Sequence, residues 1–328
     1  MNVFLNVIFL LVGLFLVVKG GDYFVTSAVS LAKKTKIPEV IIGATIVSLA
    51  TTLPELIVSV VASANGQFDM AVGNGVGTMI SNIAFICGVS IFFIPMKVKK
   101  SSNVKYFILL FCALFVIISS LNNSLDLYES IILLVVFAFF MTVNVIEAIK
   151  EMKKYPQEKD EDFIESKQQV MPWKKIIPLF LIGALAIAFG AMTLVDTASN
   201  LAKIIGVSDE IVGLTVVALG TSLPELTTAI ISVKKQSDIG YGNIIGANII
   251  NNTLLLGLSG AIAGKKGLPI TKESLFINIP ILFVVTLIFI LPLIFKSKTY
   301  KWQGLTLLIL YSAYIVYLIL TALGVVVV

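Results

Sequence analysis

Apolar runs of about 20 residues, separated by short polar gaps, follow one another along the whole chain. The runs show no alternation of apolar and polar residues, so they are typical of membrane-spanning helices and not of barrel strands. The pattern predicts an all-α membrane protein with ten transmembrane helices. We expect these helices near Val3–Val18, Glu39–Ala64, Met70–Met96, Tyr106–Ser120, Leu125–Ala148, Ile176–Val195, Glu210–Val233, Ile239–Ala263, Leu275–Phe295 and Trp302–Val325.

The polar gaps predict how the chain is oriented in the membrane. When the gaps are assigned alternately to the two sides, one side holds 20 lysines and the other holds 4. Cytoplasmic loops collect Lys and Arg, so we expect the lysine-rich side, which includes the long loop 149–175, in the cytoplasm and both termini outside. The first run lacks a basic leader, and its first lysine, Lys19, follows it, which favours a retained helix over a cleaved signal peptide.

The composition supports a membrane protein and excludes other classes. Hydrophobic residues make up 58% of the chain, charged residues only 13%, and the mean hydropathy is +1.01, which excludes a soluble or disordered chain. The net charge of +5 comes from lysines in the gaps, without the basic stripe that nucleic-acid binding needs. The sequence has no His, and Cys87 and Cys112 lie inside apolar runs, so we expect two core cysteines and no zinc site.

One segment of the chain occurs twice. Gly43–Glu55 returns 170 residues later as Gly213–Glu225, and each copy ends an apolar run with Pro-Glu. Gly73–Asn82 likewise matches Gly242–Asn251. Five helices per half is an odd number, so the second copy must enter the membrane from the opposite face, which predicts two inverted five-helix repeats. We therefore divide the chain into a first repeat 1–148, a cytoplasmic linker loop 149–175 and a second repeat 176–328.

The Pro-Glu segments predict an ion site, because a carboxylate and a proline inside an apolar run are both costly. In a helix, Pro54 would free the carbonyl of Ala50 and introduce a kink. Thr51, Thr52 and Glu55 would add side-chain oxygens within one turn of that carbonyl. The second half offers the same kinds of oxygen from Thr221, Ser222, Glu225 and the carbonyls of residues 218–220. Hard oxygen ligands of this kind suit Ca²⁺ or Na⁺ better than zinc or copper.

The second matching segment combines small residues with amides. Its glycines are spaced for close approach between helices, and they form the pairs Gly73/Gly77 and Gly242/Gly246. Asn82 and Asn251 follow about one turn later, at equivalent places in the two copies. A buried amide needs polar partners, and the repeat symmetry brings both amides towards the glutamates. We therefore predict that Asn82 and Asn251 belong to the ion site.

On these residues the chain resembles the cation/calcium exchanger superfamily, whose best-known branch is the sodium/calcium exchangers. Members carry Gly-Thr-Ser-x-Pro-Glu in two α-repeats; Gly220–Glu225 matches this motif fully, and Ala50–Glu55 reads Ala-Thr-Thr-Leu-Pro-Glu. The resemblance covers nearly the whole chain and implies ten helices with a cytoplasmic loop after the fifth. It also implies alternating access, in which two outer helices slide against a fixed core of eight.

The resemblance further implies roles for individual positions. Ca²⁺ would be bound by Glu55, Glu225, Thr51 and Thr221. The sodium sites would use Thr52, Ser222, the carbonyls of Ser48 and Ala218, and the positions of Thr78 and Ala247. Two positions depart from the sodium-coupled branch, which typically has a hydroxyl where this chain has Ala247 and often an Asp where it has Asn251.

The predicted function is a secondary antiporter of the cell membrane that exchanges Ca²⁺ for Na⁺ by alternating access. Two ionised glutamates balance one Ca²⁺, so emptying the site demands about two monovalent cations in a low-dielectric environment. Because Ala247 has no hydroxyl and burial favours protonated glutamates, Ca²⁺/H⁺ antiport is one alternative, and a passive divalent-cation channel is another. The sequence contains no nucleophile–base pair or cofactor motif, so we expect no enzymatic activity and no cofactor. The expected partners are Ca²⁺, Na⁺ or H⁺ and the lipid bilayer, without nucleic acid, and the sequence leaves the oligomeric state open.

Overall fold

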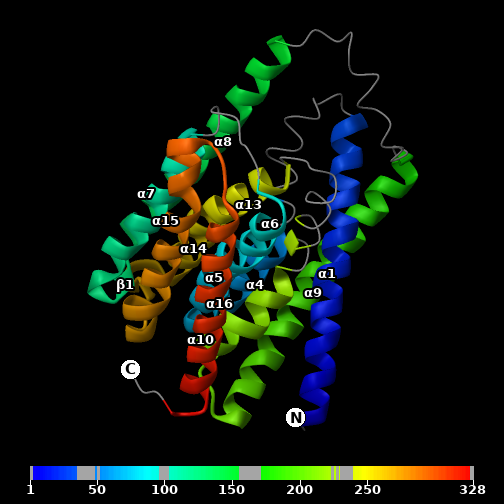
Figure 1. Ribbon diagram of the computed structural model, residues 1–328. Coiled ribbons are helices and arrows are strands. Elements are labelled where there is room, and N and C mark those ends of the chain that lie inside the picture. The colour runs from blue at the N-terminus through cyan, green and yellow to red at the C-terminus, as the bar shows by residue number, and fades with distance from the viewer. Residues whose placement is uncertain are drawn as a thin grey trace.

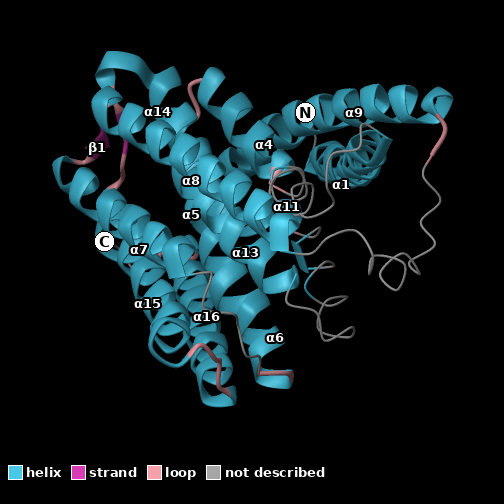
Figure 2. Ribbon diagram, turned by 90° about the horizontal axis from the view of Figure 1, so that it is seen from above, coloured by secondary structure: helices cyan, strands magenta, loops and turns pink. Residues whose placement is uncertain are grey.

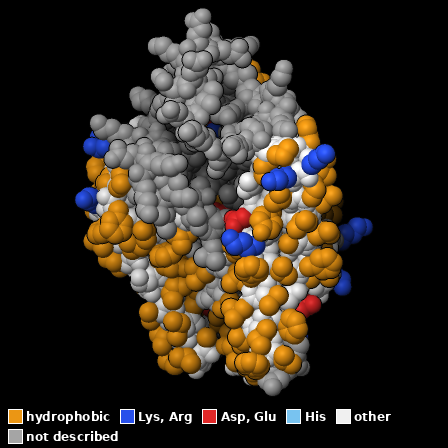
Figure 3. Space-filling model, turned by 90° about the vertical axis from the view of Figure 1, so that its right-hand side faces the viewer, with side chains coloured by type: hydrophobic (Ala, Val, Ile, Leu, Met, Phe, Trp, Pro, Cys, Tyr) orange, Lys and Arg blue, Asp and Glu red, His pale blue; other side chains and the backbone are white. Residues whose placement is uncertain are grey.

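The computed structural model describes residues 3–34, 49, 52–95, 103–154, 171–222, 225, 226, 229 and 239–325, and most of these residues are helical (Figure 1). Eight helical stretches among them are long and apolar enough to cross a membrane. They are Val3–Phe24, Phe68–Phe93, Val104–Asn122, Leu127–Glu147, Trp173–Ile205, Ile244–Lys266, Ser274–Lys296 and Lys301–Ala322. The described surface in Figure 3 is mostly hydrophobic, as expected for side chains that face lipid. The chain is a multi-pass membrane protein.

The eight stretches correspond to eight of the ten predicted helices. The second and seventh predicted helices run through residues outside the described part of the chain, so the total of ten stays a prediction. Of the second helix, the structure describes mainly α4 (Leu53–Ala64). Of the seventh, it describes mainly three consecutive pieces, α10 (Asp209–Val212), η6 (Gly213–Val217) and α11 (Ala218–Thr221).

Two long helices, α1 (Val3–Lys34) and α9 (Trp173–Ile205), stand together at one edge of the bundle (Figures 1 and 2). They run antiparallel and touch through small residues. A Cβ atom on Gly13 would lie 3.0 Å from the carbonyl oxygen of Gly190, and one on Gly183 would lie 2.8 Å from that of Gly20. These glycines let the two backbones approach each other closely, a common way to pack helices in membranes.

The first helix is longer than its apolar run predicts. We expected it to end near Val18 with Lys19 behind it, but α1 continues to Lys34. Its 32 residues correspond to about 48 Å, well beyond the roughly 30 Å hydrocarbon core. The prediction failed because the length of an apolar run indicates only how much of a helix lies in the hydrocarbon. The helix continues beyond this run because it packs against α9; for example, the rings of Phe24 and Phe180 are 4.3 Å apart.

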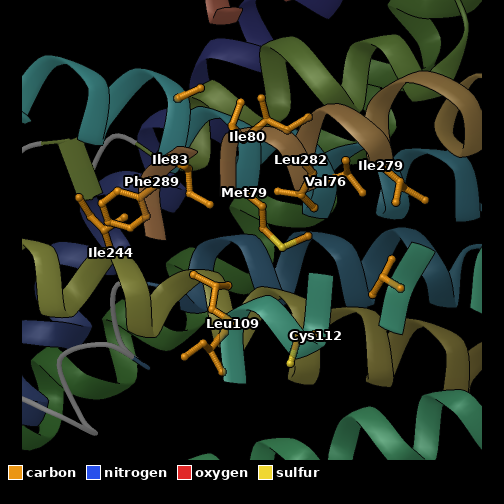
Figure 4. Packing of buried hydrophobic residues seen from close by; sticks show 14 of the residues in the cluster. Val76, Met79, Ile80, Ile83, Leu109, Cys112, Ile244, Ile279, Leu282 and Phe289 are labelled. Carbon is orange, nitrogen blue, oxygen red and sulfur yellow. The ribbon is translucent and has the colours of Figure 1, made fainter. Parts of the chain in front are cut away.

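The centre of the bundle is α5 (Phe68–Ile80), which continues into the π-helical segment η2 (Ser81–Cys87) and α6 (Gly88–Phe93). Residues from Met70 to Ile80 are all buried. The helix α5 packs against α4, α10, η6 and α15 (Ile279–Lys296). Next to them, α13 (Ile239–Ile250) contacts η2, and α7 (Asn103–Ser119) packs on α13 and α15. Figure 4 shows their apolar side chains interdigitating, with Met79 between Leu109 and Leu282. Both cysteines are buried in this core, as predicted.

Several helices contain a π-helical turn. Besides η2 and η6, η7 (Asn251–Leu255) joins α13 to α14 (Leu256–Ala263), and η9 (Ser274–Asn278) precedes α15. Such turns are rare and occur frequently at functional sites. The segments η2 and η7 begin within one residue of matching positions in the two sequence copies, next to Asn82 and Asn251.

Two short strands join loops that are far apart in the sequence. The strand β1 (Ser124–Leu125), which precedes α8 (Leu127–Lys154), pairs antiparallel with β2 (Leu268–Pro269), which follows α14. The last helix is α16 (Lys301–Ala322). The two chain ends lie at one end of the bundle, and the end of α8 and the start of α9 lie at the other (Figure 1). The division at loop 149–175 stays a prediction, since residues 155–170 are outside the described part.

Candidate cation site

The first candidate glutamate, Glu55, lies in the first turn of α4 and is fully buried. Thr52 is the N-cap residue of this helix, and its hydroxyl donates to the carbonyl oxygen of Leu49 at 3.2 Å. Pro54 occupies the first turn, where its missing N–H leaves no hydrogen bond unmade. Leu49 is helical too, but residues 50 and 51 lie outside the described part of the chain, so the kink predicted at the carbonyl of Ala50 stays a prediction.

The second candidate glutamate, Glu225, is also fully buried. Both Glu225 and Thr221 are near enough to act electrostatically on the Glu55 carboxylate. The predicted partners from the two halves of the chain are therefore close together in the structure. Two like charges in a buried place repel each other and lose hydration, so an ionised pair needs a cation between its members.

A buried amide joins the two halves beside these glutamates. The side chain of Asn74 in α5 donates to the carbonyl oxygen of Glu55 at 3.1 Å and to the hydroxyl of Ser59 at 2.8 Å. Its own carbonyl oxygen accepts a hydrogen bond from the Thr221 hydroxyl at 3.4 Å. Asn74 is fully buried, so these bonds are shielded from water. Asn74 therefore connects the backbone at Glu55 to the side chain at Thr221.

The second half gathers further oxygens at α11. The Ser222 hydroxyl lies 2.7 Å from the carbonyl oxygen of Ala218, to which it donates. The Thr221 hydroxyl lies 3.1 Å from the carbonyl oxygen of Val217 and 3.3 Å from that of Ala218. The three predicted ligands in this segment, Ala218, Thr221 and Ser222, are all buried. These oxygens form a compact set of the kind that a small hard cation accepts.

Thr78, Asn82, Ala247 and Asn251 are buried as well, but among the described residues no hydrogen bond joins them to the glutamates. The amide atoms of Asn82 and Asn251 and the hydroxyl of Thr78 are buried without a hydrogen-bond partner among the described residues. Ala247 is fully buried and offers no side-chain oxygen. The segment that begins at Asn251, η7, packs against α4. Ser48 and Thr51 lie outside the described residues.

Three unpaired polar side chains in one core are uncommon, because a buried polar group without a hydrogen bond costs about 1–3 kcal/mol. An ion or water at the site would satisfy these atoms. Within the described ranges, no three His, Cys, Asp or Glu side chains cluster as metal ligands. A cation here would therefore be held by two carboxylates and neutral oxygens, as the sequence predicts.

Sequence analysis missed the role of Asn74. It treated the Gly-Asn-x-x-Gly segment as a packing motif, and the packing is confirmed: a Cβ atom on Gly73 would lie 2.5 Å from the carbonyl oxygen of Glu210, and one on Gly77 would lie 2.7 Å from Leu214. The available signal was the asparagine itself, since an amide beside two packing glycines must find partners.

Comparison with known proteins relates nearly the whole chain to one family. The family described as sodium/calcium exchanger protein matches residues 5–146 and 175–320. The sodium/calcium exchanger MaX1 of Methanosarcina acetivorans is 30% identical over 95% of this chain and 98% of its own. The putative antiporter CaxA of Alkalimonas amylolytica is 35% identical over 78% of this chain and 80% of its own. The sodium-calcium exchanger NCX_Mj, soaked with 100 mM Na⁺ and 10 mM Sr²⁺, is a solved structure with a TM-score of 0.66 and 28% identity, covering 96% of this chain and 99% of that one.

The hydrogen bonds of Asn74 predict the effect of a minimal substitution. Asn74→Asp removes the amide donor that reaches Glu55 and Ser59 and adds a third carboxylate to the site, so we expect it to lower the free energy of unfolding by about 1–3 kcal/mol. Asn122→Asp is the matched control, because Asn122 is exposed and only accepts, through its oxygen, from Ser124. Thermal unfolding of the purified proteins in detergent without added divalent cations measures both. Equal stability of the two variants would contradict the bridging role.

Proposed function

Because the chain belongs to the sodium/calcium exchanger protein family, we propose that it binds Ca²⁺ between its two halves and that Na⁺ entry drives Ca²⁺ transport in the opposite direction. The family makes it a membrane antiporter of the cation/Ca²⁺ exchange class, that is, a transporter and not an enzyme. The identity of the coupling ion and the ligand roles of individual residues are our proposal. A resident cofactor is not part of it.

The proposal rests on one observation: Glu55 and Glu225 are both fully buried and lie close enough for their charges to interact. Two carboxylates neutralise one divalent cation, and the neutral oxygens of Thr221 and Asn74 lie next to them. We propose that Ca²⁺ is bound by Glu55, Glu225, Thr51 and Thr221, with Asn82 and Asn251 completing the polar shell. Removal of Ca²⁺ would leave two adjacent charges, so monovalent cations must replace it, and exchange follows from the charge of the site.

The neutral oxygens around the pair favour Na⁺ as the replacing ion. Na⁺ needs several oxygen ligands, whereas a proton needs one base. We assign the sodium sites to Thr52, Ser222, Thr78 and the carbonyls of Ser48 and Ala218, with Ala247 as the position that lacks a side-chain ligand. The adjacent oxygens of Ser222 and Ala218 support this assignment. The missing hydroxyl at Ala247 is the one observation that favours Ca²⁺/H⁺ antiport.

For the mechanism, we propose alternating access in which α1 and α9 move together along the outside of the remaining helices. The antiparallel contact of these two helices and their position at the edge of the bundle support this division (Figure 2). The same antiparallel arrangement supports two inverted repeats of five helices, since α1 and α9 open the two halves.

The first prediction concerns orientation. The lysine distribution places both termini outside and loop 149–175 in the cytoplasm of a cell-membrane protein. The native residues Cys87 and Cys112 are buried, so labelling of a single introduced cysteine can be measured without a background reaction from them. A cysteine at Lys265 should react with an impermeant thiol reagent on intact cells, and one at Lys159 only after permeabilisation. The reverse pattern would contradict the orientation.

The second prediction concerns the glutamates. Glu55→Gln and Glu225→Gln each remove half the charge of the site while nearly conserving its shape, so we expect Ca²⁺ transport to fall at least about 100-fold with normal insertion. Glu129→Gln is the control, since Glu129 lies at the start of α8 and accepts a backbone hydrogen bond there. Calcium-45 uptake into proteoliposomes measures all three. Near-normal uptake by either site variant would refute the assignment.

The third prediction concerns the coupling ion. We expect Ca²⁺ uptake driven by an outward Na⁺ gradient at clamped pH, and none driven by an outward H⁺ gradient without Na⁺. Ala247→Ser adds a hydroxyl and should lower the half-maximal Na⁺ concentration by about threefold, which corresponds to one weak ligand, whereas Ala263→Ser at the end of α14 should not. Uptake driven by protons alone would favour the Ca²⁺/H⁺ alternative, and uptake that needs no counter-ion would indicate a channel.

A further inference from the structure

A second buried carboxylate lies outside the candidate cation site. Glu210 in α10 has only 3% of its surface exposed. It accepts a hydrogen bond from the Thr271 hydroxyl at 2.6 Å, one from the Ser274 hydroxyl, and one from the Asn278 amide at 3.0 Å. All three partners come from the loop after β2 and from η9, more than 60 residues further along the chain. The carboxylate thus joins α10 to the start of α15.

The groups around Glu210 act as donors to it. Asn278 uses its own carbonyl oxygen to accept from the Tyr314 hydroxyl at 3.0 Å. Three donors from one segment converge on the Glu210 carboxylate, and each of these hydrogen bonds is costly to leave unmade in a buried place. The arrangement therefore indicates an anchoring carboxylate.

The backbone of the same turn is packed on the opposite side. A Cβ atom on Gly73 would lie 2.5 Å from the carbonyl oxygen of Glu210. One on Gly213 would lie 2.7 Å from the carbonyl oxygen of Met70 and 3.0 Å from the amide nitrogen of Asn74. Hence α10 is held between η9 on one side and α5 on the other. Its contact on α5 directly adjoins Asn74, the residue that bridges Glu55 and Thr221.

The anchor belongs to one half of the chain. Pairing Gly43 with Gly213 aligns Glu210 with Val40, which has no polar side chain. The repeat fold as such therefore does not require a carboxylate at this position. Burying a glutamate costs free energy, so a buried glutamate found in only one half indicates a specific role in that half.

We propose that Glu210 is a positioning residue for ion exchange. Its carboxylate, held by Thr271, Ser274 and Asn278, fixes the register of α10–α11 against α5 and thereby places the Thr221 hydroxyl beside Glu55. Glu210 touches no transported ion in this arrangement and acts through the helix that carries Thr221. The inference rests on the proposed function, because it assigns Glu210 an effect on Ca²⁺ affinity.

The test compares two substitutions at one position. Glu210→Gln keeps the shape and can accept from Ser274 and Asn278 while its amide donates to Thr271. Glu210→Val introduces the residue of the first half and leaves the donors without an acceptor. We expect Glu210→Val to raise the KM for Ca²⁺ in proteoliposome uptake about tenfold, with a smaller change in maximal rate, and Glu210→Gln to stay within about threefold of the unmodified protein.

Amide hydrogen exchange of residues 208–222 is the second readout, and it does not depend on transport. We expect faster exchange in this segment for Glu210→Val and unchanged exchange for Glu210→Gln. Glu273→Gln is the control, because Glu273 lies at the same end of the bundle, accepts from Tyr317 and does not contact α10 in the hydrogen-bond network. It removes the same charge and should leave both KM and exchange unchanged. If Glu210→Val fails to insert, Thr271→Val, which removes one donor at similar volume, should raise KM about threefold.

The following outcomes would contradict the inference. An unchanged KM together with unchanged hydrogen exchange in Glu210→Val would show that the anchor positions nothing. An equal rise of KM in Glu210→Gln, or in Glu273→Gln, would show that negative charge at this end of the bundle matters and that the position of α10 does not. If the unmodified protein transports no Ca²⁺, the proposed function fails, whereas the hydrogen exchange of residues 208–222 still decides whether Glu210 fixes this helix.

Discussion

The structure depends on one constraint: two acidic side chains, Glu55 and Glu225, lie buried side by side inside a membrane protein. Neither hydrophobic packing nor neutral hydrogen bonds can compensate for two adjacent negative charges at low dielectric. An ionised pair therefore needs positive charge beside it, and under the proposed function the transported cations supply that charge. Much of the surrounding architecture can be understood as the means of keeping the two carboxylates at a fixed separation. Asn74, Thr221 and the close contact of α5 with α10 all serve this end.

The central helix α5 is where these constraints meet. Its residues are buried on every side, and its glycines admit α10 and η6 at backbone distance. A helix packed in this way has little freedom to move relative to its neighbours, because close-packed interiors resist small displacements. By contrast, α1 and α9 pack chiefly on each other at the edge of the bundle. The division between a rigid centre and a separable pair is thus a property of packing, independent of which ion is bound.

Sequence reasoning reached those parts of the structure that repeat or that depend on hydropathy alone. The eight described spans, the burial of both glutamates and the packing role of Gly73 and Gly77 follow from apolar length and internal similarity. It failed where the deciding contact comes from elsewhere in the fold. The donors to Glu210 are distant in sequence, and α1 extends past its apolar run because α9 lies beside it.

The glycine contacts between α1 and α9 carry a further consequence. Adding 170 to Gly13 gives Gly183, and adding it to Gly20 gives Gly190, so the two contacts, Gly13 with Gly190 and Gly20 with Gly183, are one contact counted from each half. Their contact therefore has local twofold symmetry. In the proposed inverted-repeat arrangement this dyad lies in the plane of the membrane, so displacement of the pair towards either face would meet equivalent contacts between the two helices. Two end states of similar energy are what a reversible carrier needs, since a large difference would leave one of them almost unpopulated. The direction of transport would then be decided by the ion gradients and not by the protein.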